Sequence, residues 1–530
     1  METKLLANRE DLNHQLSRTS KTGTNDPDES LRTDHLLPDL GERTTRGGLI
    51  MIGAHGFKFA IGIVGTAIMA RLLTPSDYGL IGMVAVVTNF VSLFKDLGLS
   101  FPTVQRAEVK FDQISTLFWI NAGVSLLAAV TVAALAPGIA WFYGEPRLTM
   151  VAVALGLGFV LGGLAVQHEA LLRRQMKFVA LSAIALASII TGYAVGMICA
   201  FNGHGYWSLV YSQWALLSAN LVGVFLLCRW CPGVPKLTSD TKSMLEFGGN
   251  ITAYSVINYF SRNSDILLVG RFWGAQQLGF YSKAGQLAAL PSDQVDEPLA
   301  SVAIPALSRL VGADDRYRQA YLRMLEKVML LTLPPLTWMI VTADWLVELI
   351  LGRHWDYTGT ILVFVGIGVL LQPVINTFGW LFISQGRSRD MLHWAAVNAP
   401  ISLLTILVGL PWGAAGVAAS FGFGRLLVVT PVSYWIVGRS GPVRTSDLFR
   451  CTAPFLLAAI SSALGVLTFR TLELVANPIV GLTLAAAIIT TIMLSVLLLI
   501  PSSRNALKDI RRICLLLWST RLRTPAVGIE

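Results

Sequence analysis

One apolar stretch of the chain carries polar side chains at helical spacing. In "NITAYSVINYFSRNSDILLVG" they recur every three or four residues, at Asn250, Tyr254, Asn258, Arg262 and Asp265. That spacing places all five on one face of a helix. Arg262 and Asp265 are three residues apart, so they could pair with each other or act on a ligand. The pattern predicts a helix face that lines a polar cavity.

Four basic side chains lie inside long apolar stretches: Lys58, Arg262, Lys283 and Arg425. A charge in the middle of a membrane costs about 2.5 to 3.5 kcal/mol on insertion scales, so such residues usually face a wet cavity or a partner. We therefore expect them to line a cavity. Arg425 lies in the glycine-rich run "SFGFGRLLVV" and could equally stabilise a helix break.

Other polar residues are weaker candidates. His55 lies in the first apolar stretch, where a single polar side chain more often links neighbouring helices. Asp293, Asp296 and Glu297 could bind Na⁺ or relay protons, or they could offset nearby basic residues at a helix end. A single Cys-x-x-Cys pair, without a second pair or nearby histidines, is weak evidence for a metal site, so we expect no metal. We also expect no catalytic residue.

Composition places these residues in a membrane protein. The chain is 54% hydrophobic and only 14% charged, where soluble proteins carry about 25% charged residues. Apolar runs continue from about residue 48 to residue 500, which favours one integral membrane domain. Residues 1–47 are polar and mixed in charge, so they predict a disordered cytoplasmic tail.

Fourteen apolar stretches approach the length of about 20 residues that crosses a bilayer. Their approximate centres are residues 59, 88, 125, 158, 190, 217, 258, 289, 333, 371, 401, 425, 461 and 489. The sequence has 41 basic residues, and 32 of them lie in the two tails and in every second loop. Five lie in the other loops, and four lie inside spans. Because Lys and Arg collect on the cytoplasmic side, both termini are predicted to be cytoplasmic.

These spans predict an all-α integral membrane fold of about 14 transmembrane helices. After the tail, residues 48–245 would form a first lobe of six spans and residues 246–440 a second lobe of six. Residues 441–500 would add spans thirteen and fourteen, and residues 501–530 a cytoplasmic C-terminal tail.

A short motif occurs twice, as "ARLLTPSDYG" and "GRFWGAQQLG". Arg71 and Arg271 each end an odd-numbered span, and Gly79 and Gly279 each begin the next. Six spans separate the two copies, so the lobes are predicted to be parallel repeats around a central cleft, as in alternating-access transporters. Arg71, Arg271 and Trp273 are candidates for a gate at the external end of that cleft.

The motifs "ARLLTPSDYGLIGM", "DLGLS" and "NSDILLVGRFWGAQQLGFYSKAGQLAALP" resemble the polysaccharide flippases of the multidrug/oligosaccharidyl-lipid/polysaccharide superfamily, especially the exopolysaccharide and colanic-acid type. The similarity extends over roughly residues 45–500. It implies movement of a polyprenyl-pyrophosphate-linked oligosaccharide across a bacterial inner membrane, for exopolysaccharide or lipopolysaccharide biosynthesis.

This cargo is anionic, which suits a cleft lined by cations. The expected substrate-binding residues are Arg262, Lys58, Lys283, Arg425, Asn258, Asp265, Tyr254 and Asn250. The resemblance also makes a polysaccharide polymerase and chain-length or export proteins candidate partners. No cofactor is expected beyond coupling to Na⁺ or H⁺.

Two other functions remain open from the sequence. A cation-coupled multidrug exporter of the same superfamily would share the fold, but its usually cationic cargo fits poorly with an excess of intramembrane basic residues. A membrane-embedded glycosyltransferase or polymerase generally needs a sizeable external loop, and every predicted external loop is short.

The net charge of +9 follows from the excess of Lys and Arg in the cytoplasmic loops and tails, and it predicts no nucleic-acid partner. The sequence contains no Walker motif, which argues against ATP hydrolysis as the energy source.

Overall fold

The computed structural model describes the backbone of residues 40–93, 103, 110–228, 230–235, 239–473 and 477–500. Within these ranges it also describes the side chains, apart from those of residues 40–50, 52, 239–258, 260–262 and 297. The described residues form helices and the turns between them, with no strand among them. Ten helical stretches in this part are long and apolar enough to cross a membrane, so the chain is a multi-pass membrane protein.

The first lobe, here called the N-lobe, contains six helices. They are α2 (Leu40–Leu72), α3 (Pro75–Ser92), α5 (Phe111–Tyr143), α6 (Leu148–Arg174), α7 (Phe178–Phe201) and α8 (Trp207–Cys228). The break between α2 and α3 follows from local chemistry. Thr74 caps α3 in a reciprocal pair of hydrogen bonds with Asp77, and Pro75 occupies the first helical position, where a missing N–H costs nothing.

Helix α9 (Ser239–Ser308) is 70 residues long and holds the seventh and eighth predicted spans. It is kinked at Gly274, whose φ of 77° is readily adopted only by glycine. Gly274 lies 200 residues after Thr74, the residue at the break between α2 and α3. Both copies of the repeated motif therefore interrupt a helix at the same position.

Helix α9 and the helices that follow it, up to α16, form the C-lobe. These are α10 (Asp314–Val341), α11 (Ala343–Ile350), η3 (Arg353–Trp355), α12 (Asp356–Val369), α13 (Gln372–Ser384), α14 (Ser388–Gly409), η4 (Leu410–Trp412), α15 (Gly413–Gly424), η5 (Arg425–Val429) and α16 (Thr430–Gly438). The η5 turn is a π-helix that begins at Arg425, so the helix does depart from α geometry there. Helices α17 (Thr445–Thr471) and α18 (Pro478–Leu499) follow the C-lobe.

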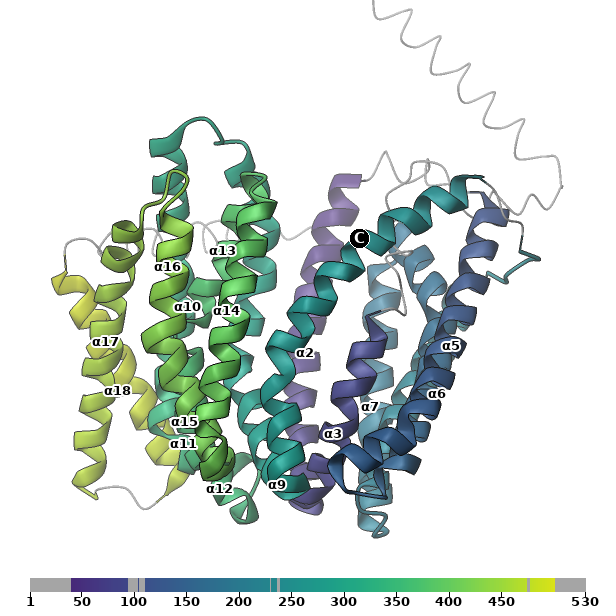
Figure 1. Ribbon diagram of the computed structural model, residues 1–530, viewed down its shortest axis with the longest axis horizontal. Coiled ribbons are helices and arrows are strands. Elements are labelled where there is room, and N and C mark those ends of the chain that lie inside the picture. The colour runs from purple at the N-terminus through teal and green to yellow at the C-terminus, as the bar shows by residue number, and fades with distance from the viewer. Residues whose placement is uncertain are drawn as a thin grey trace, which may run out of the picture.

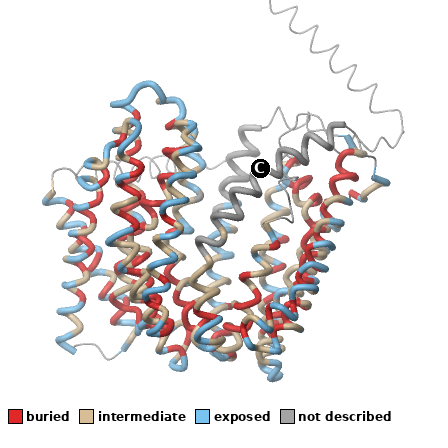
Figure 2. The backbone as a smooth tube through the Cα atoms, viewed as in Figure 1, coloured by how far each residue is buried: buried red, intermediate tan, exposed pale blue. Residues whose placement is uncertain are grey.

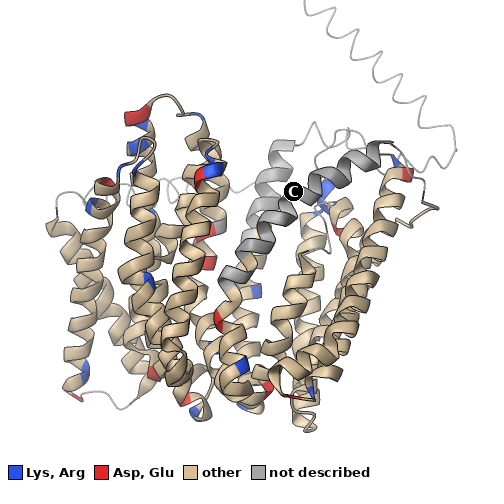
Figure 3. Cartoon of the chain, in the orientation of Figure 1, with Lys and Arg blue, Asp and Glu red and all other residues tan. Residues whose placement is uncertain are grey.

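Nearly all centres of the predicted spans fall on helices, while the count of fourteen spans stays a prediction beside the ten described stretches that are long and apolar enough to cross a membrane. Thirteen of the fourteen predicted centres lie within helical residues, and residue 371 falls at the turn between α12 and α13. Helices α17 and α18 pack on α10 and α11 of the C-lobe. Figure 1 shows the two lobes side by side, with α9 running between them. In Figure 3, the charged residues of the described part lie mostly towards the ends of the helices.

The buried core shows how the lobes meet. The largest buried cluster combines N-lobe residues such as Ala70 and Leu80 with C-lobe residues such as Leu278, Leu351 and Trp355. Two further clusters belong to one lobe each, one to α5, α6, α7 and α8 and the other to the C-lobe with α17 and α18. Figure 2 shows buried residues along the inner faces of both bundles. The lobes therefore share a core at the end where α2 and α3 meet, and the helices diverge towards the other end (Figure 1).

Candidate functional site: a cationic cavity closed by the repeated motif

The glycines of the two motif copies hold the lobes together. A Cβ atom at Gly79 would lie 1.7 Å from the carbonyl oxygen of Ala275, and a Cβ atom at Gly279 would lie 1.8 Å from that of Pro75. Each glycine thus contacts the backbone of the other copy, at positions that are related by 200 residues. Only residues without a Cβ allow helices to approach this closely.

Side chains from both lobes surround this crossing. The Nη2 atom of Arg71 donates to the carbonyl oxygen of Leu349 at 2.6 Å. The indole Nε1 of Trp355, which is fully buried, donates to the carbonyl oxygen of Ala70 at 2.8 Å. The same oxygen lies 2.9 Å from Nε2 of His354. We call the contacts made by Ala70, Arg71, Pro75, Gly79, Ala275, Gly279 and Trp355 the interlobe seal.

The other two gate candidates, Arg271 and Trp273, differ in the lobe that they contact. The guanidinium of Arg271 lies 5.7 Å from the ring centroid of Phe142, which belongs to the N-lobe, so this arginine also reaches the opposite lobe. Trp273 donates to the carbonyl oxygen of Leu410 at 2.8 Å and packs near Gly413, and both of these residues belong to the C-lobe. The two motif arginines are therefore placed between the lobes, whereas the described contacts of Trp273 lie within one lobe.

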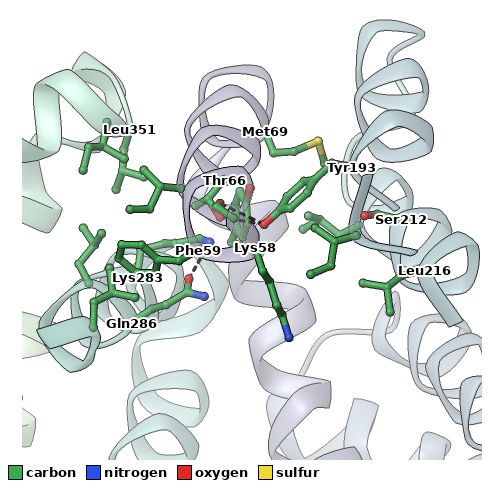
Figure 4. Close-up of a pocket in the computed structure, with 18 of the residues that line it drawn as sticks. Lys58, Phe59, Thr66, Met69, Tyr193, Ser212, Leu216, Lys283, Gln286 and Leu351 are labelled. Carbon is green, nitrogen blue, oxygen red and sulfur yellow. Dashed lines mark hydrogen bonds between the residues drawn. The ribbon is translucent and has the colours of Figure 1, made fainter. Parts of the chain in front are cut away.

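A cavity of about 600 Å³ ends at the interlobe seal. Its lining comes from α2, α3, α7, α8, α9 and the end of α11. Met69, Tyr78 and Leu351 lie next to the seal, and Met69 and Leu351 are almost fully buried. Figure 4 shows the side chains of Thr66, Tyr193 and Ser212 converging from three helices. The Thr66 and Tyr193 hydroxyls lie 3.2 Å apart.

Three of the basic or polar residues that the sequence singled out line this cavity: His55, Lys58 and Lys283. Lys58 is exposed, and Figure 4 shows its side chain extending away from the other labelled residues. Lys283 is only 8% exposed. Its Nζ atom donates to Oε1 of Gln286 at 3.0 Å and lies 4.0 Å from the ring centroid of Tyr78. The lining of this cavity therefore includes two lysines and several hydroxyl and amide groups.

Asp265 and Arg425 lie elsewhere, in a second cavity of about 320 Å³ inside the C-lobe. Oδ2 of Asp265 accepts a hydrogen bond from the hydroxyl of Tyr281 at 2.8 Å. Its Oδ1 atom is buried and has no hydrogen-bond partner in the described part of the chain. Arg425 donates to Oε1 of Gln372. The two alternatives for Asp265, pairing with Arg262 or action on a ligand, both remain predictions, and one of its oxygens is bound by a tyrosine.

The acidic cluster borders the same second cavity. Asp293 lines it, and Asp296 accepts a hydrogen bond from Asn376, which also lines it. The side chain of Glu297 lies outside the described part, as do those of Asn250, Tyr254, Asn258 and Arg262. The polar stripe proposed for the seventh span therefore remains a prediction for these four residues.

Helix α9 is the wall between the two cavities. Lys283 and Gln286 face the first cavity, whereas Tyr281, Gly285 and Ser292 face the second, because residues two positions apart point to different sides of a helix. The sequence did not single out Tyr78, Tyr193 or Gln286. Tyr78 had a signal that went unused, since it directly precedes Gly79 within the repeated motif.

Comparison with known proteins places this architecture in a family. A sequence profile of the polysaccharide biosynthesis proteins matches residues 68–358. The chain is 24% identical to the lipopolysaccharide biosynthesis protein WzxC of Escherichia coli K12, over 81% of its own length and 88% of the relative. It is 25% identical to the teichuronic acid biosynthesis protein TuaB of Bacillus subtilis 168, over 77% and 85%. The succinoglycan biosynthesis transport protein ExoT of Rhizobium meliloti is 23% identical, over 78% and 83%.

Solved structures show the same fold at low sequence identity. The lipid II flippase MurJ in an inward closed conformation aligns with a TM-score of 0.65 at 13% identity, over 84% of this chain and 98% of MurJ. An inward-facing MATE transporter of the MOP superfamily aligns with a TM-score of 0.53 at 11% identity, over 74% and 96%. The chain therefore belongs to the polysaccharide biosynthesis protein family, and its fold is similar to those of MurJ and the MATE transporter.

Proposed function

We propose that this protein is a flippase that moves a polyprenyl-pyrophosphate-linked oligosaccharide across the bacterial inner membrane by alternating access. The observation that carries the proposal is a cavity of about 600 Å³ that presents Lys58 and Lys283 and is closed at one end by contacts between the lobes. Ammonium groups form charge-assisted hydrogen bonds with phosphate oxygens. Hydroxyl and amide groups on the same walls suit a sugar.

The names of the relatives support this cargo. Three are described as lipopolysaccharide, teichuronic acid and succinoglycan biosynthesis or transport proteins, and the solved MurJ structure is described as a lipid II flippase. All four names refer to glycan polymers or their lipid-linked precursors. The product here would accordingly be an exopolysaccharide or lipopolysaccharide, and a polymerase and export proteins would act on the translocated unit.

The direction of transport follows from the charge bias of the loops. With both termini in the cytoplasm, the interlobe seal faces the periplasm and the diverging end of the lobes faces the cytoplasm. The cargo would enter from the cytoplasmic leaflet, contact Lys58, Lys283 and the polar face around Arg262, and leave after the seal opens. Arg71 and Arg271 would part from the opposite lobe in that step.

Coupling to Na⁺ or H⁺ would use the second cavity. A buried carboxylate oxygen usually has a hydrogen-bond partner, so the unpaired Oδ1 of Asp265 suits a proton or a bound cation. Asp293 lies in the same cavity and adds negative charge. These carboxylates are also what a cation-coupled multidrug exporter would use, so transport of a cationic dye is the appropriate comparison.

Transport by purified protein tests the proposal. Proteoliposomes containing the full chain should move a fluorescent lipid-linked oligosaccharide from one leaflet to the other, as measured by its accessibility to a glycosidase outside the vesicles. Lys58→Met should reduce this movement by tenfold or more, because each charge-assisted hydrogen bond contributes about 1.5 to 3 kcal/mol. Transport of a cationic dye without movement of the lipid-linked oligosaccharide would instead support the exporter.

A further inference from the structure

A continuous series of contacts joins the first cavity to the interlobe seal. It begins at Lys283 of α9, whose ammonium lies over the ring of Tyr78 of α3, at 4.0 Å from the centroid. The Tyr78 ring in turn meets the indole of Trp355 edge-on, with centroids 5.5 Å apart. Trp355 then donates to the carbonyl oxygen of Ala70. The Tyr78 ring of the N-lobe thus lies between the side chains of Lys283 and Trp355 of the C-lobe.

The environment of Lys283 is unusual for a charged group. Its ammonium contacts the ring face of Tyr78 and the amide oxygen of Gln286, both of them neutral. Within the described part of the chain, no carboxylate lies within ion-pair distance of its Nζ atom. A buried charge that lacks an opposite charge is poorly compensated. An anion in the cavity therefore stabilises the charge of Lys283 more than it would stabilise a lysine that already has an ion-pair partner.

An anion at Lys283 must compete with the ring of Tyr78. A charge-assisted hydrogen bond to phosphate is stronger than a contact with a ring face or an amide, so a bound anion draws the ammonium away from Tyr78. The Tyr78 ring then keeps its edge contact with Trp355 but loses its contact with the Lys283 ammonium. The closed arrangement loses one of the contacts that stabilise it.

We propose that Lys283 and Tyr78 form an occupancy sensor, in which a diphosphate bound at Lys283 weakens the interlobe seal. The identity of this anion rests on the proposed function, since the cargo supplies the diphosphate. The sensor makes opening of the seal depend on a loaded cavity. By linkage, it also requires the anion to bind more tightly when the seal is open than when it is closed.

The opening of the seal can be measured with a buried thiol. Ala70 is fully buried at the seal, so the Ala70→Cys variant in an otherwise cysteine-free chain should react with a bulky maleimide only when the seal opens. The probe ligand is inorganic pyrophosphate, applied to the full-length protein in nanodiscs. We expect pyrophosphate to raise the labelling rate about fivefold or more. An unchanged or slower rate with bound pyrophosphate would overturn the proposal.

Variants of Tyr78 separate a sensor from a purely structural contact. Tyr78→Phe keeps the ring face and should keep the response to pyrophosphate. Tyr78→Leu should label faster without ligand and lose the response, while still binding pyrophosphate in a direct titration. If Tyr78→Leu labels faster but responds like the wild type, Tyr78 is only a structural residue and the proposal fails.

A second measurement covers the case in which Ala70→Cys does not fold. A Cβ atom at Gly82 would lie 3.7 Å from Cγ of Leu278, so the pair Gly82→Cys and Leu278→Cys should form a disulfide while the seal is closed. Pyrophosphate should then slow disulfide formation, and equal rates would contradict the sensor.

The same preparations separate this inference from the proposed function. Wild-type protein that moves lipid-linked oligosaccharide without responding to pyrophosphate would disprove the sensor alone. A response to pyrophosphate without movement of any lipid-linked oligosaccharide would disprove the proposed cargo and leave the sensor for another anion.

Discussion

Gly79 and Gly279 occupy equivalent positions in the two motif copies, and each packs against the backbone of the opposite copy. The partner of Gly79 is the carbonyl of Ala275, and the partner of Gly279 is the carbonyl of Pro75. This exchange is what a parallel repeat produces when its two copies meet around one axis. The duplicated motif thus supplies both halves of a single interlobe contact.

Alanine at either glycine should open the interlobe seal. Because the clashing atom is a backbone oxygen, no side-chain rotation relieves it, and the helices must separate. We expect Gly79→Ala to disfavour the closed state by about 1 to 3 kcal/mol, the usual cost of overpacking. Labelling of the Ala70→Cys reporter should rise accordingly.

Gly82→Ala is the matched control for this change. It lies one turn further along α3, where an added Cβ would meet Leu278 at an ordinary 3.5 Å. Its labelling rate should equal that of the Ala70→Cys reporter without a glycine substitution, which is the parent protein. Equal rates for Gly79→Ala and the parent would show that the crossing is not part of the closed state.

Arg262 should contribute to cargo binding if the polar stripe lines the cleft. Arg262→Ala should abolish polymer secretion at normal abundance in the membrane. Arg262→Lys should retain part of the secretion if charge alone matters, and less if a two-pronged phosphate contact is needed. Secreted polymer per unit of inserted protein is the measurement, and wild-type secretion by Arg262→Ala would remove this residue from the site.

Asp265 should determine whether transport depends on an ion gradient. Asp265→Asn keeps the shape and removes the charge, so it should make oligosaccharide movement insensitive to imposed Na⁺ and H⁺ gradients. Transport in proteoliposomes under each gradient separates the two ions. The proposed role is wrong if the variant responds to both gradients as the wild type does.

Arg470 should stabilise the attachment of α17 to the C-lobe. It pairs with Asp344, donates to the carbonyl oxygen of Val341 at 2.6 Å and lies 4.4 Å from a ring centroid of Trp345. Arg470→Ala should cost about 1 to 2 kcal/mol, given that the pair is partly exposed. The melting temperature in detergent should fall. Arg147→Ala, at another loop ion pair, should change it less, because Arg147 pairs with its near neighbour Glu145 and lies farther from a ring, at 6.0 Å from the centroid of Tyr206.

The predicted topology can be tested by thiol labelling in cells. Arg353 lies at the same end as the seal, with an 88% exposed side chain, and Ser440 lies in the loop before α17. After permeabilisation of the outer membrane, an impermeant maleimide should label Arg353→Cys and not Ser440→Cys. The reverse pattern would invert the assignment of the cytoplasmic side.

The sequence was sufficient for several features that depend on local pattern. Hydropathy located the spans, because a helix that crosses a membrane must be apolar over its whole length. The spacing of Arg71 and Gly79, repeated at Arg271 and Gly279, revealed the duplication. The glycine-rich run before Arg425 indicated an irregular helix, and the helix passes through a π-helical turn at Arg425–Val429 without breaking.

The tertiary structure decided which faces meet. Lys283 and Asp265 belong to the same long helix, yet its rotation and kink direct one into each cavity, and the composition of the helix does not encode that choice. Tyr78 and Trp355 are 277 residues apart and become neighbours only when the lobes pack at the interlobe seal. In a chain whose spans are apolar all round, the hydropathy pattern fixes each helix but leaves its partners open, because close packing between helices selects them.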